Sequence, residues 1–341
     1  MLGVSIGNYK IVEKIGQGGV GEVYRAVHDM LGRATAVKIL LPATSDSYEM
    51  ILRLFNEARS ASSIRHPGIV EVYDFGFLHD QTAYIIMELL EGETLGAMLR
   101  REQRVPYARA IDIARSVAET LHAAHEQGIV HRDLKPANIF LVPDPDAPGG
   151  ERVKLLDFGM AKLGLADMDE SLTRTGVVLG TPPYMSPEQC RDASVIDRRS
   201  DLYALGCVLY KLLCGRPPFV CASAGEVIAH HLYFPPEPPC IHDELIPRAL
   251  ENLVMWLLQK DPDRRPATAA HVVAALDALG PATGAPASGP GRPRWSGETK
   301  TLPMISASTP PPPAAGPRRS RRTTCPLRRD RRSRRGHEPR R

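Results

Sequence analysis

Alternating hydrophobic and polar positions mark the first ninety residues of the chain as mostly β-structure. The segments YKIVEKIG, EVYRAVHD and RATAVKIL alternate β-branched or aromatic residues with polar ones, and glycines punctuate them. Two further segments, IVEVYDFGF and AYIIMELLEG, continue this strand pattern. One helical pattern, at residues 47–64, interrupts it. The sequence therefore predicts a small β-rich lobe that contains one helix.

The hydrophobic period changes after Gly92. Ile111, Ala114, Val117 and Leu121 recur at helical spacing, so we expect a long amphipathic helix over residues 108–125. Short strands and loops should follow to about residue 190, and helices should then continue to Leu279. A small β-rich lobe at about 9–90, followed by a larger helical lobe at about 91–279, is a bilobal α+β fold.

The composition shifts at Gly280, where the predicted domain of residues 9–279 ends. Residues 280–341 are first rich in Pro, Gly and Ala and then rich in Arg, and they cannot bury enough apolar surface to fold. This tail has fourteen arginines and one lysine against three acidic residues, a net charge of +12. The preceding 280 residues carry 28 basic and 36 acidic side chains, a net charge of −8.

The basic tail leaves several interpretations open. Its charge suits anionic surfaces such as a nucleic acid or a membrane. Trp295 is its only aromatic residue, which argues against a platform on which bases stack. Arg-rich runs are more often solvated and unspecific. A truncated or frame-shifted end is a further alternative.

The overall composition, with 43% hydrophobic and 24% charged residues, is that of an ordinary globular protein. None of the six cysteines forms a CxxC pair, so we expect neither a disulfide framework nor a cysteine-based metal site. The first residues lack the basic and apolar regions of a secretory signal, and no run of about 18 apolar residues occurs. We therefore expect a cytoplasmic protein without a membrane span.

A glycine-rich stretch, IGQGGVGEVY, covers residues 15–24. Gly16, Gly18 and Gly21 fit the pattern GxGxxG, which lets backbone N–H groups approach a phosphate. In a dinucleotide-binding fold a helix would follow, but EVYRAV alternates like a strand. The sequence thus favours a hairpin that covers a nucleotide, although an ordinary glycine turn would also fit this stretch in isolation.

Two charged residues occupy positions that should face inward. Lys38 shares a strand face with Ala36 and Leu40, and a buried ammonium group needs an anionic partner. Glu57 lies on the apolar face of the helix at residues 47–64, so the two opposite charges are predicted to pair. The alternative is that both side chains extend to solvent.

The loop HRDLKPAN and the segment KLLDFGM supply hard oxygen ligands. Asp157 and Asn138 are suited to bind Mg²⁺, which prefers oxygen and keeps phosphate oxygens in its shell. Asp133 can accept a proton from an attacking hydroxyl group, and Lys135 can neutralise charge on a transferring phosphoryl group.

Together these motifs resemble the eukaryotic-type protein kinase family, and most closely its bacterial serine/threonine branch. The resemblance runs from Tyr9 to Leu279 and includes GQGGVGEV, AVK, HRDLKPAN, DFG and SPE in the family's order. Asp201 matches the aspartate that braces the catalytic loop. Arg265 matches the arginine that pairs with the glutamate of the SPE motif, here Glu188.

The resemblance implies a serine/threonine protein kinase that uses ATP with Mg²⁺, or with Mn²⁺ as an alternative, on protein substrates. It implies catalytic roles for Asp133, Lys135, Lys38 and Glu57, and metal binding by Asn138 and Asp157. The residues that it assigns to the nucleotide are Ile15, Gly16, Gly18, Gly21, Val23, Ala36, Lys38, Met87, Glu88, Leu90 and Phe140.

Residues 160–185 correspond to the family's activation loop. We expect phosphorylation at Thr173 or Thr175, in trans between two copies of the chain, with Arg132 available to pair with the phosphate. The competing hypothesis is a pseudokinase that binds nucleotide and acts as a scaffold. Such proteins usually lose Lys38, Asp133 or Asp157, and this sequence keeps all three.

Overall fold

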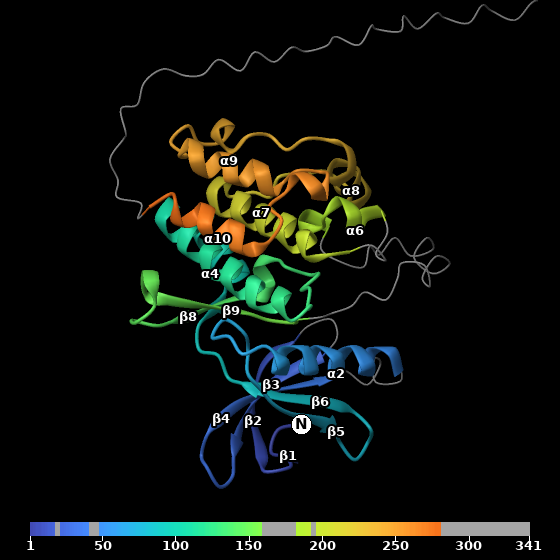
Figure 1. Cartoon of the computed structure of the whole chain (residues 1–341). Helices are drawn as coiled ribbons and strands as arrows, with labels where there is room; N and C mark the ends of the chain where they lie inside the picture. Colours follow the sequence, from blue (N-terminus) through green and yellow to red (C-terminus); the bar gives the residue numbers. More distant parts are fainter. Residues whose placement is uncertain (18–20, 41–47, 159–181, 192–195, 281–341) are drawn as a thin grey trace, which may run out of the picture. The chain divides into compact units, whose positions relative to one another are not determined.

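The computed structural model describes residues 1–17, 21–40, 48–158, 182–191 and 196–280 (Figure 1). Gly18, the two predicted phosphorylation sites and the basic tail lie outside these ranges. The backbone of Glu57 is described, but its side chain is not.

The small lobe contains a six-stranded antiparallel sheet and one helix. The sheet has the order β1-β2-β3-β4-β6-β5, and helix α2 (Tyr48–Ser63) contacts β5 and β6 (Figure 1). The strands are β1 (Ser5–Ile6), β2 (Tyr9–Gln17), β3 (Gly21–His28), β4 (Ala34–Leu40), β5 (Val72–Phe77) and β6 (Ala83–Glu88). The prediction of a β-rich lobe with one helix is confirmed.

The sheet buries apolar side chains on both faces. One cluster includes Ile11, Val37 and Ile86. The other lies between the sheet and α2 and includes Leu40 and Ala58. Because β4 is central and covered on both sides, its side chains are nearly all buried, and the strand lacks the alternation of a half-exposed strand.

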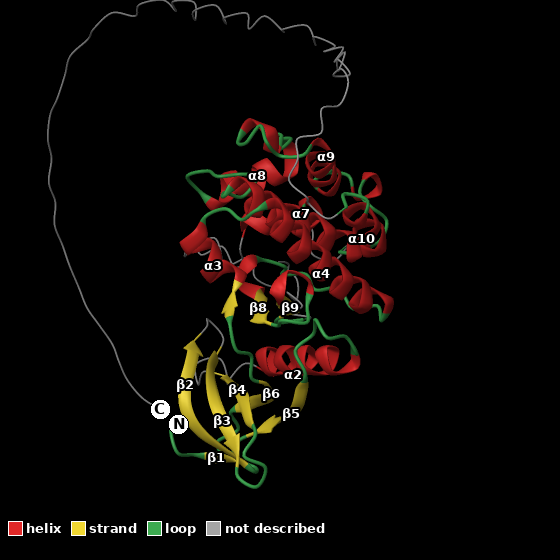
Figure 2. Ribbon diagram, turned by 90° about the vertical axis from the view of Figure 1, so that its left-hand side faces the viewer, coloured by secondary structure: helices red, strands yellow, loops and turns green. Residues whose placement is uncertain are grey.

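The larger lobe is built mainly of helices (Figure 2). Its helices are α3 (Leu95–Glu102), α4 (Tyr107–Glu126), α6 (Pro187–Arg191), α7 (Arg198–Cys214), α8 (Ala224–Tyr233), α9 (Arg248–Leu257) and α10 (Ala269–Asp277). The long helix predicted at residues 108–125 is α4. Helix α7 packs against α4 and α9, and fourteen of its seventeen residues are buried, which explains its hydrophobic residues on every side.

A second, three-stranded sheet lies where the larger lobe begins. Its order is β7-β8-β9, with β7 (Glu93–Thr94), β8 (Ile139–Pro143) and β9 (Glu151–Leu155). Ile69, from the small lobe, forms an isolated parallel bridge with Leu155 of β9. This bridge joins the segment before β5 to the strand that leads into Asp157.

Short 3₁₀ turns connect several of these elements. They are Pro136–Asn138, Pro148–Gly150, Pro182–Tyr184, Pro239–Ile241 and Pro262–Arg264. Among the described residues, no helix is long and apolar enough to cross a membrane.

Candidate active site

A cleft of about 470 Å³ is lined by residues of both lobes. The ten described residues that the sequence assigned to a nucleotide all line it, namely Ile15, Gly16, Gly21, Val23, Ala36, Lys38, Met87, Glu88, Leu90 and Phe140. Its walls are mainly apolar, and Asp157 lies among the lining residues. Apolar walls with a few charged groups suit a ligand that has a flat ring and an anionic end.

Lys38 is held in the cleft by its position on β4. Its backbone is paired with Val23 of β3 on one side and with Ile85 of β6 on the other. Its ammonium nitrogen lies 2.8 Å from Oδ1 of Asp157, and the Lys38 side chain is only 15% exposed. The prediction that Lys38 faces inward is confirmed, and its pairing with Glu57 stays a prediction.

Asp133 lies at the centre of a cluster of polar side chains. The ammonium group of Lys135 donates to Oδ2 of Asp133 at 2.7 Å. The amide nitrogen of Asn138 donates to the Asp133 carbonyl oxygen at 2.9 Å and to Oδ2 at 3.2 Å. No described donor reaches Oδ1 of Asp133, so this oxygen can accept a proton from a ligand.

The backbone that leads into Asp133 is held in place by Asp201. The two carboxylate oxygens of this buried residue accept the N–H groups of His131 and Arg132, each at 2.8 Å. The ring nitrogen Nε2 of His125 lies 2.8 Å from the same carboxylate. Arg132 has a positive φ of 66°, a costly conformation for a non-glycine residue that these bonds help to stabilise. The bracing role expected of Asp201 is confirmed.

Asp157 also has a positive φ, of 57°. Its position follows from β9, because the preceding residue, Leu156, donates its N–H to the carbonyl oxygen of Asn138 at 2.9 Å. Phe158 is buried, and the centre of its ring lies 4.7 Å from that of His131. The backbone therefore brings Asp157 beside Asn138, although the two residues are far apart in the sequence.

Glu188 and Arg265 form a two-point ion pair, with N–O distances of 2.7 and 2.8 Å, as the sequence predicted. Burial raises the pKa of Glu188, but the hydrogen bonds from Arg265 and Ser200 outweigh this effect, and the net pKa is lowered. The neighbouring Gln189 donates its side-chain N–H to the Arg132 carbonyl oxygen at 2.6 Å. The segment around Glu188 is thereby attached to the catalytic loop.

Gly16 and Gly21, the described glycines of the glycine-rich stretch, differ in the space that surrounds them. A Cβ atom on Gly21 would lie 2.5 Å from the carbonyl oxygen of Ile39, so only glycine fits the close approach of β3 to β4. A Cβ atom on Gly16 would meet nothing nearer than Val23, at 3.9 Å. Gly21 is therefore required by the sheet, whereas Gly16 is available for the approach of a ligand.

Asn138 and Asp157 could hold a metal ion. Asn138 is 5% exposed, and both its donor contacts go to Asp133, which leaves its amide oxygen for a cation. No three His, Cys, Asp or Glu side chains within the described ranges lie close enough to bind a metal by themselves. One carboxylate and one amide oxygen fit Mg²⁺, which completes its shell with water and phosphate oxygens.

Comparison with known proteins shows the family to which the chain belongs. A model of the protein kinase domain matches residues 9–275, more than three quarters of the chain. The chain belongs to the protein kinase family. The kinase fold is shared with the crystal structure of the PknI kinase domain of Mycobacterium tuberculosis, at a TM-score of 0.63 and 25% identity. That match covers 82% of this chain and 98% of the PknI chain.

Curated bacterial kinases are also similar to this chain. The serine/threonine-protein kinase pkn3 of Myxococcus xanthus is 40% identical over 274 residues, which are 80% of this chain and 50% of pkn3. PknB of Mycobacterium tuberculosis is 39% identical over 271 residues, which are 79% of this chain and 42% of PknB. The kinase chain thus spans half or less of the length of these relatives.

Sequence reasoning missed one ion pair beside the kinase cleft. Lys154 of β9 contacts the carboxylate of Glu88, which ends β6 and begins the connection between the lobes at residues 88–90, here called the hinge. The sequence also missed Thr94, which lines the cleft and caps α3 through a hydrogen bond from the N–H of Ala97. A threonine before an apolar helical run is a capping signal that could have revealed this residue.

Proposed function

We propose that this chain is a serine/threonine protein kinase that transfers the γ-phosphoryl group of ATP to hydroxyl groups of proteins. The observation that carries the proposal is the arrangement around Asp133, in which Lys135 and Asn138 contact one carboxylate oxygen and leave the other open. The similarity to curated bacterial serine/threonine kinases supports the choice of acceptor residue.

Each side chain has a role that its chemistry allows. Asp133 orients the attacking hydroxyl group and accepts its proton through Oδ1. Lys135, which is 22% exposed, contributes positive charge beside the phosphoryl group in transit. Lys38 and its partner Asp157 are the charged groups at the inner end of the cleft, where Lys38 can bind phosphate oxygens of ATP.

The metal and the nucleotide have predicted positions on these residues. Asn138 and Asp157 would hold Mg²⁺, or Mn²⁺ as an alternative, and the metal would neutralise negative charge on the phosphates when bound. The backbone of residues 88–90 would contact the adenine base, with Val23, Ala36 and Phe140 on its two faces. Most of the catalysis would then come from positioning and from charge neutralisation.

The test compares the variant Asp133→Asn with the wild-type chain, using γ-labelled ATP, Mg²⁺ and a basic protein substrate. We expect the variant to lose at least about a thousandfold in rate, because it lacks the proton acceptor. Its affinity for ADP should stay close to that of the wild type. The matched control is Asp29→Asn, an exposed carboxylate in a turn of the small lobe, which should keep full activity.

The alternative function is a nucleotide-binding scaffold. It would be favoured by a wild-type chain that binds ADP but labels neither itself nor the basic substrate. Retention of Lys38, Asp133 and Asp157 supports the active kinase instead. Labelling that is equal in Asp133→Asn and wild type would show that the activity does not come from this site.

Activation is proposed to occur by phosphorylation of Thr173 or Thr175, with two copies of the chain meeting so that one modifies the other. Mass spectrometry of active protein should find a phosphate on at least one of these threonines. If fully active protein carries neither modification, the proposal is wrong. A contact of the basic tail with anionic surfaces and a cytoplasmic location also stay predictions.

A further inference from the structure

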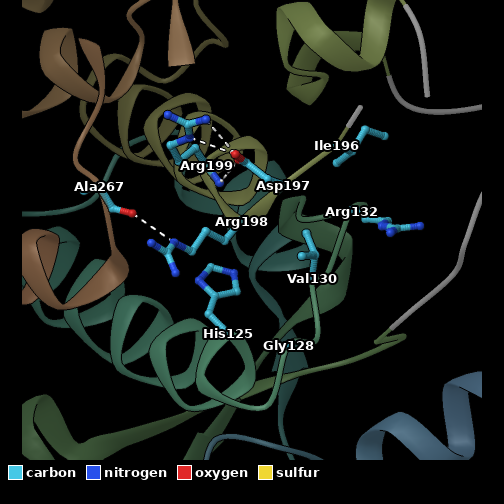
Figure 3. Close-up of a pocket in the computed structure, with 9 residues that line it drawn as sticks. All are labelled: His125, Gly128, Val130, Arg132, Ile196, Asp197, Arg198, Arg199 and Ala267. Carbon is cyan, nitrogen blue, oxygen red and sulfur yellow. Dashed lines mark hydrogen bonds and ion pairs between the residues drawn. The ribbon is translucent and has the colours of Figure 1, made fainter. Parts of the chain in front are cut away.

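A second pocket, of about 530 Å³, lies in the larger lobe beside the start of the catalytic loop (Figure 3). Its walls come from the end of α4, from the start of α7 and from the segment before α10. Neither the proposed nucleotide nor the proposed metal uses it. Three features of its walls indicate the kind of ligand that it takes.

The first feature is positive charge that no described acid neutralises. Arg199 is fully engaged, because its guanidinium group pairs with Asp197 at 2.7 Å and with Asp263 at 2.5 Å. Arg198 instead donates only its Nε–H, to the carbonyl oxygen of Ala267 at 3.0 Å. Its two terminal amino groups meet no acceptor within the described ranges. Figure 3 shows this guanidinium group within the pocket, between Ala267 and the ring of His125.

The second feature is an incompletely bonded histidine in the wall. The side chain of His125 is only 2% exposed, and its Nε2 atom lies 2.8 Å from Asp201. Its other ring nitrogen, Nδ1, is buried and has no hydrogen-bond partner among the described residues. A buried polar atom without a partner is costly, so the site is incomplete without a ligand or a water molecule.

The chemistry of Asp201 fixes the tautomer of a neutral His125 ring. Because the Asp201 carboxylate already accepts two backbone N–H groups, it acts as an acceptor toward His125 as well. Nε2 therefore carries the proton, and the Nδ1 atom of a neutral ring is a hydrogen-bond acceptor. The missing partner of Nδ1 is therefore a hydrogen-bond donor. The positive charge of Arg198 beside it nevertheless favours an anion.

The third feature is the weak attachment of the Arg198 side chain. This side chain is exposed and is held by a single hydrogen bond to Ala267, so it can shift to admit a ligand to the His125 ring. We propose that this pocket binds a phosphate group that carries a proton. Its P–OH donates to Nδ1 of His125, and its charged oxygens accept from the amino groups of Arg198. Free phosphate carries this proton at neutral pH, and a phosphorylated side chain of a protein carries it in its monoanionic form, below a pKa of about 6.

Occupation of the pocket would act on the catalytic loop through one side chain. His125 contacts Asp201, and Asp201 holds the backbone N–H groups of His131 and Arg132, directly before Asp133. A ligand on His125 is therefore linked to the backbone of the loop through Asp201, and Arg132 of the loop also lines the pocket. We expect it to change kcat more than the KM for ATP, since the nucleotide cleft is separate.

The test uses inorganic phosphate as the probe and the full chain, with ADP present so that the nucleotide cleft is filled. We expect saturable binding that shifts the ¹⁵N signals of the His125 ring. Sulfate at equal ionic strength has no proton to donate at neutral pH and should bind at least about tenfold more weakly. Arg198→Ala should also weaken phosphate binding by about tenfold or more, while Arg100→Ala, at an exposed arginine of α3, should leave it unchanged.

Two results would overturn the proposal. If phosphate leaves the His125 signals unchanged, Nδ1 is satisfied by an ordered water molecule only. If Arg198→Ala and Arg100→Ala bind phosphate equally well, the pocket is not the site. The affinity for a phosphoserine peptide distinguishes the two sources of the phosphate group. Tighter binding than inorganic phosphate supports a site for modified proteins, and weaker binding supports a site for the free anion.

Discussion

The ammonium group of Lys154 lies 2.5 Å from Oε2 of Glu88, and this contact joins the hinge to the strand that leads into Asp157. Lys154 is 8% exposed and also donates to the carbonyl oxygen of Ile69, at 3.3 Å. Strand β9 carries Lys154, which contacts Glu88 at the adenine end of the cleft, and it also forms the bridge to Ile69. The same strand leads into Asp157 at the phosphate end, so it connects the two ends of the cleft. We infer that this pair positions the two ends relative to each other.

Replacement of Lys154 by Met should therefore destabilise the chain and weaken nucleotide binding. Glu88 would lose its counter-charge, and since its side chain is 27% exposed, the cost should be about 1–3 kcal/mol rather than that of a fully buried pair. Urea unfolding and ADP titration measure the two effects. The control is Arg152→Met on the same strand, whose side chain is 45% exposed and pairs with the less exposed Asp144, and its loss should cost less than about 1 kcal/mol. Equal losses in the two variants would refute the positioning role.

Two glycine substitutions should separate the needs of the sheet from those of the ligand. Gly21→Ala should lower the free energy of unfolding by about 1–3 kcal/mol, because its Cβ atom would collide with the backbone of Ile39. Gly16→Ala has room for its Cβ atom and should change stability by less than about 0.5 kcal/mol. Thermal or urea unfolding of the two variants provides the comparison. If the two variants are equally stable, β3 and β4 can move apart at no cost in stability, and the requirement for glycine at position 21 is refuted.

Arg265→Met should be among the most destabilising single changes in the larger lobe. The Arg265 side chain is fully buried, and it bonds the carbonyl oxygens of Gln259 and Lys260 in addition to Glu188. Its loss leaves a largely buried carboxylate unpaired, at a cost of about 3–5 kcal/mol. Arg264→Met, next in the chain but 76% exposed, should be nearly neutral in the same urea unfolding experiment. A much smaller loss for Arg265→Met, of the size typical of an exposed pair, would contradict this role.

Several parts of the site could be read from the sequence because they follow local rules. The helical period at residues 108–125 predicted α4, and the charged residues of the catalytic loop predicted roles for Asp133 and Lys135, which the structure finds in contact. The roles of Asp201 and Arg265 followed from motif order within the family, and their contacts confirm both. The first two features depend on spacing within short segments, whereas the contacts of Asp201 and Arg265 span 70 and 77 positions and could be predicted only from the resemblance to the family.

Contacts between distant segments were harder to predict. Arg152 and Lys154 lie two positions apart on β9 and so share a face, yet one is exposed and the other buried. The difference arises because only Lys154 contacts the hinge, at Glu88, which is 66 positions away in the sequence. Likewise, the Lys38–Asp157 contact spans 119 positions. Such pairings depend on how the lobes pack, which local periodicity does not encode.

His231 should make the stability of the chain sensitive to acid. It is fully buried, its Nδ1 atom lies 2.9 Å from the Tyr203 hydroxyl oxygen, and burial lowers its pKa to about 3. In the unfolded chain the ordinary pKa is about 6.5, so between these values only the unfolded state binds the proton. Stability from the neutral ring is therefore present above about pH 6.5 and is lost as the pH falls below it. Urea unfolding should show that wild type loses about 1.6 kcal/mol more than His231→Leu between about pH 6.5 and pH 5. His271→Leu, at an exposed histidine, should follow the wild type, and parallel curves for all three proteins would contradict the prediction.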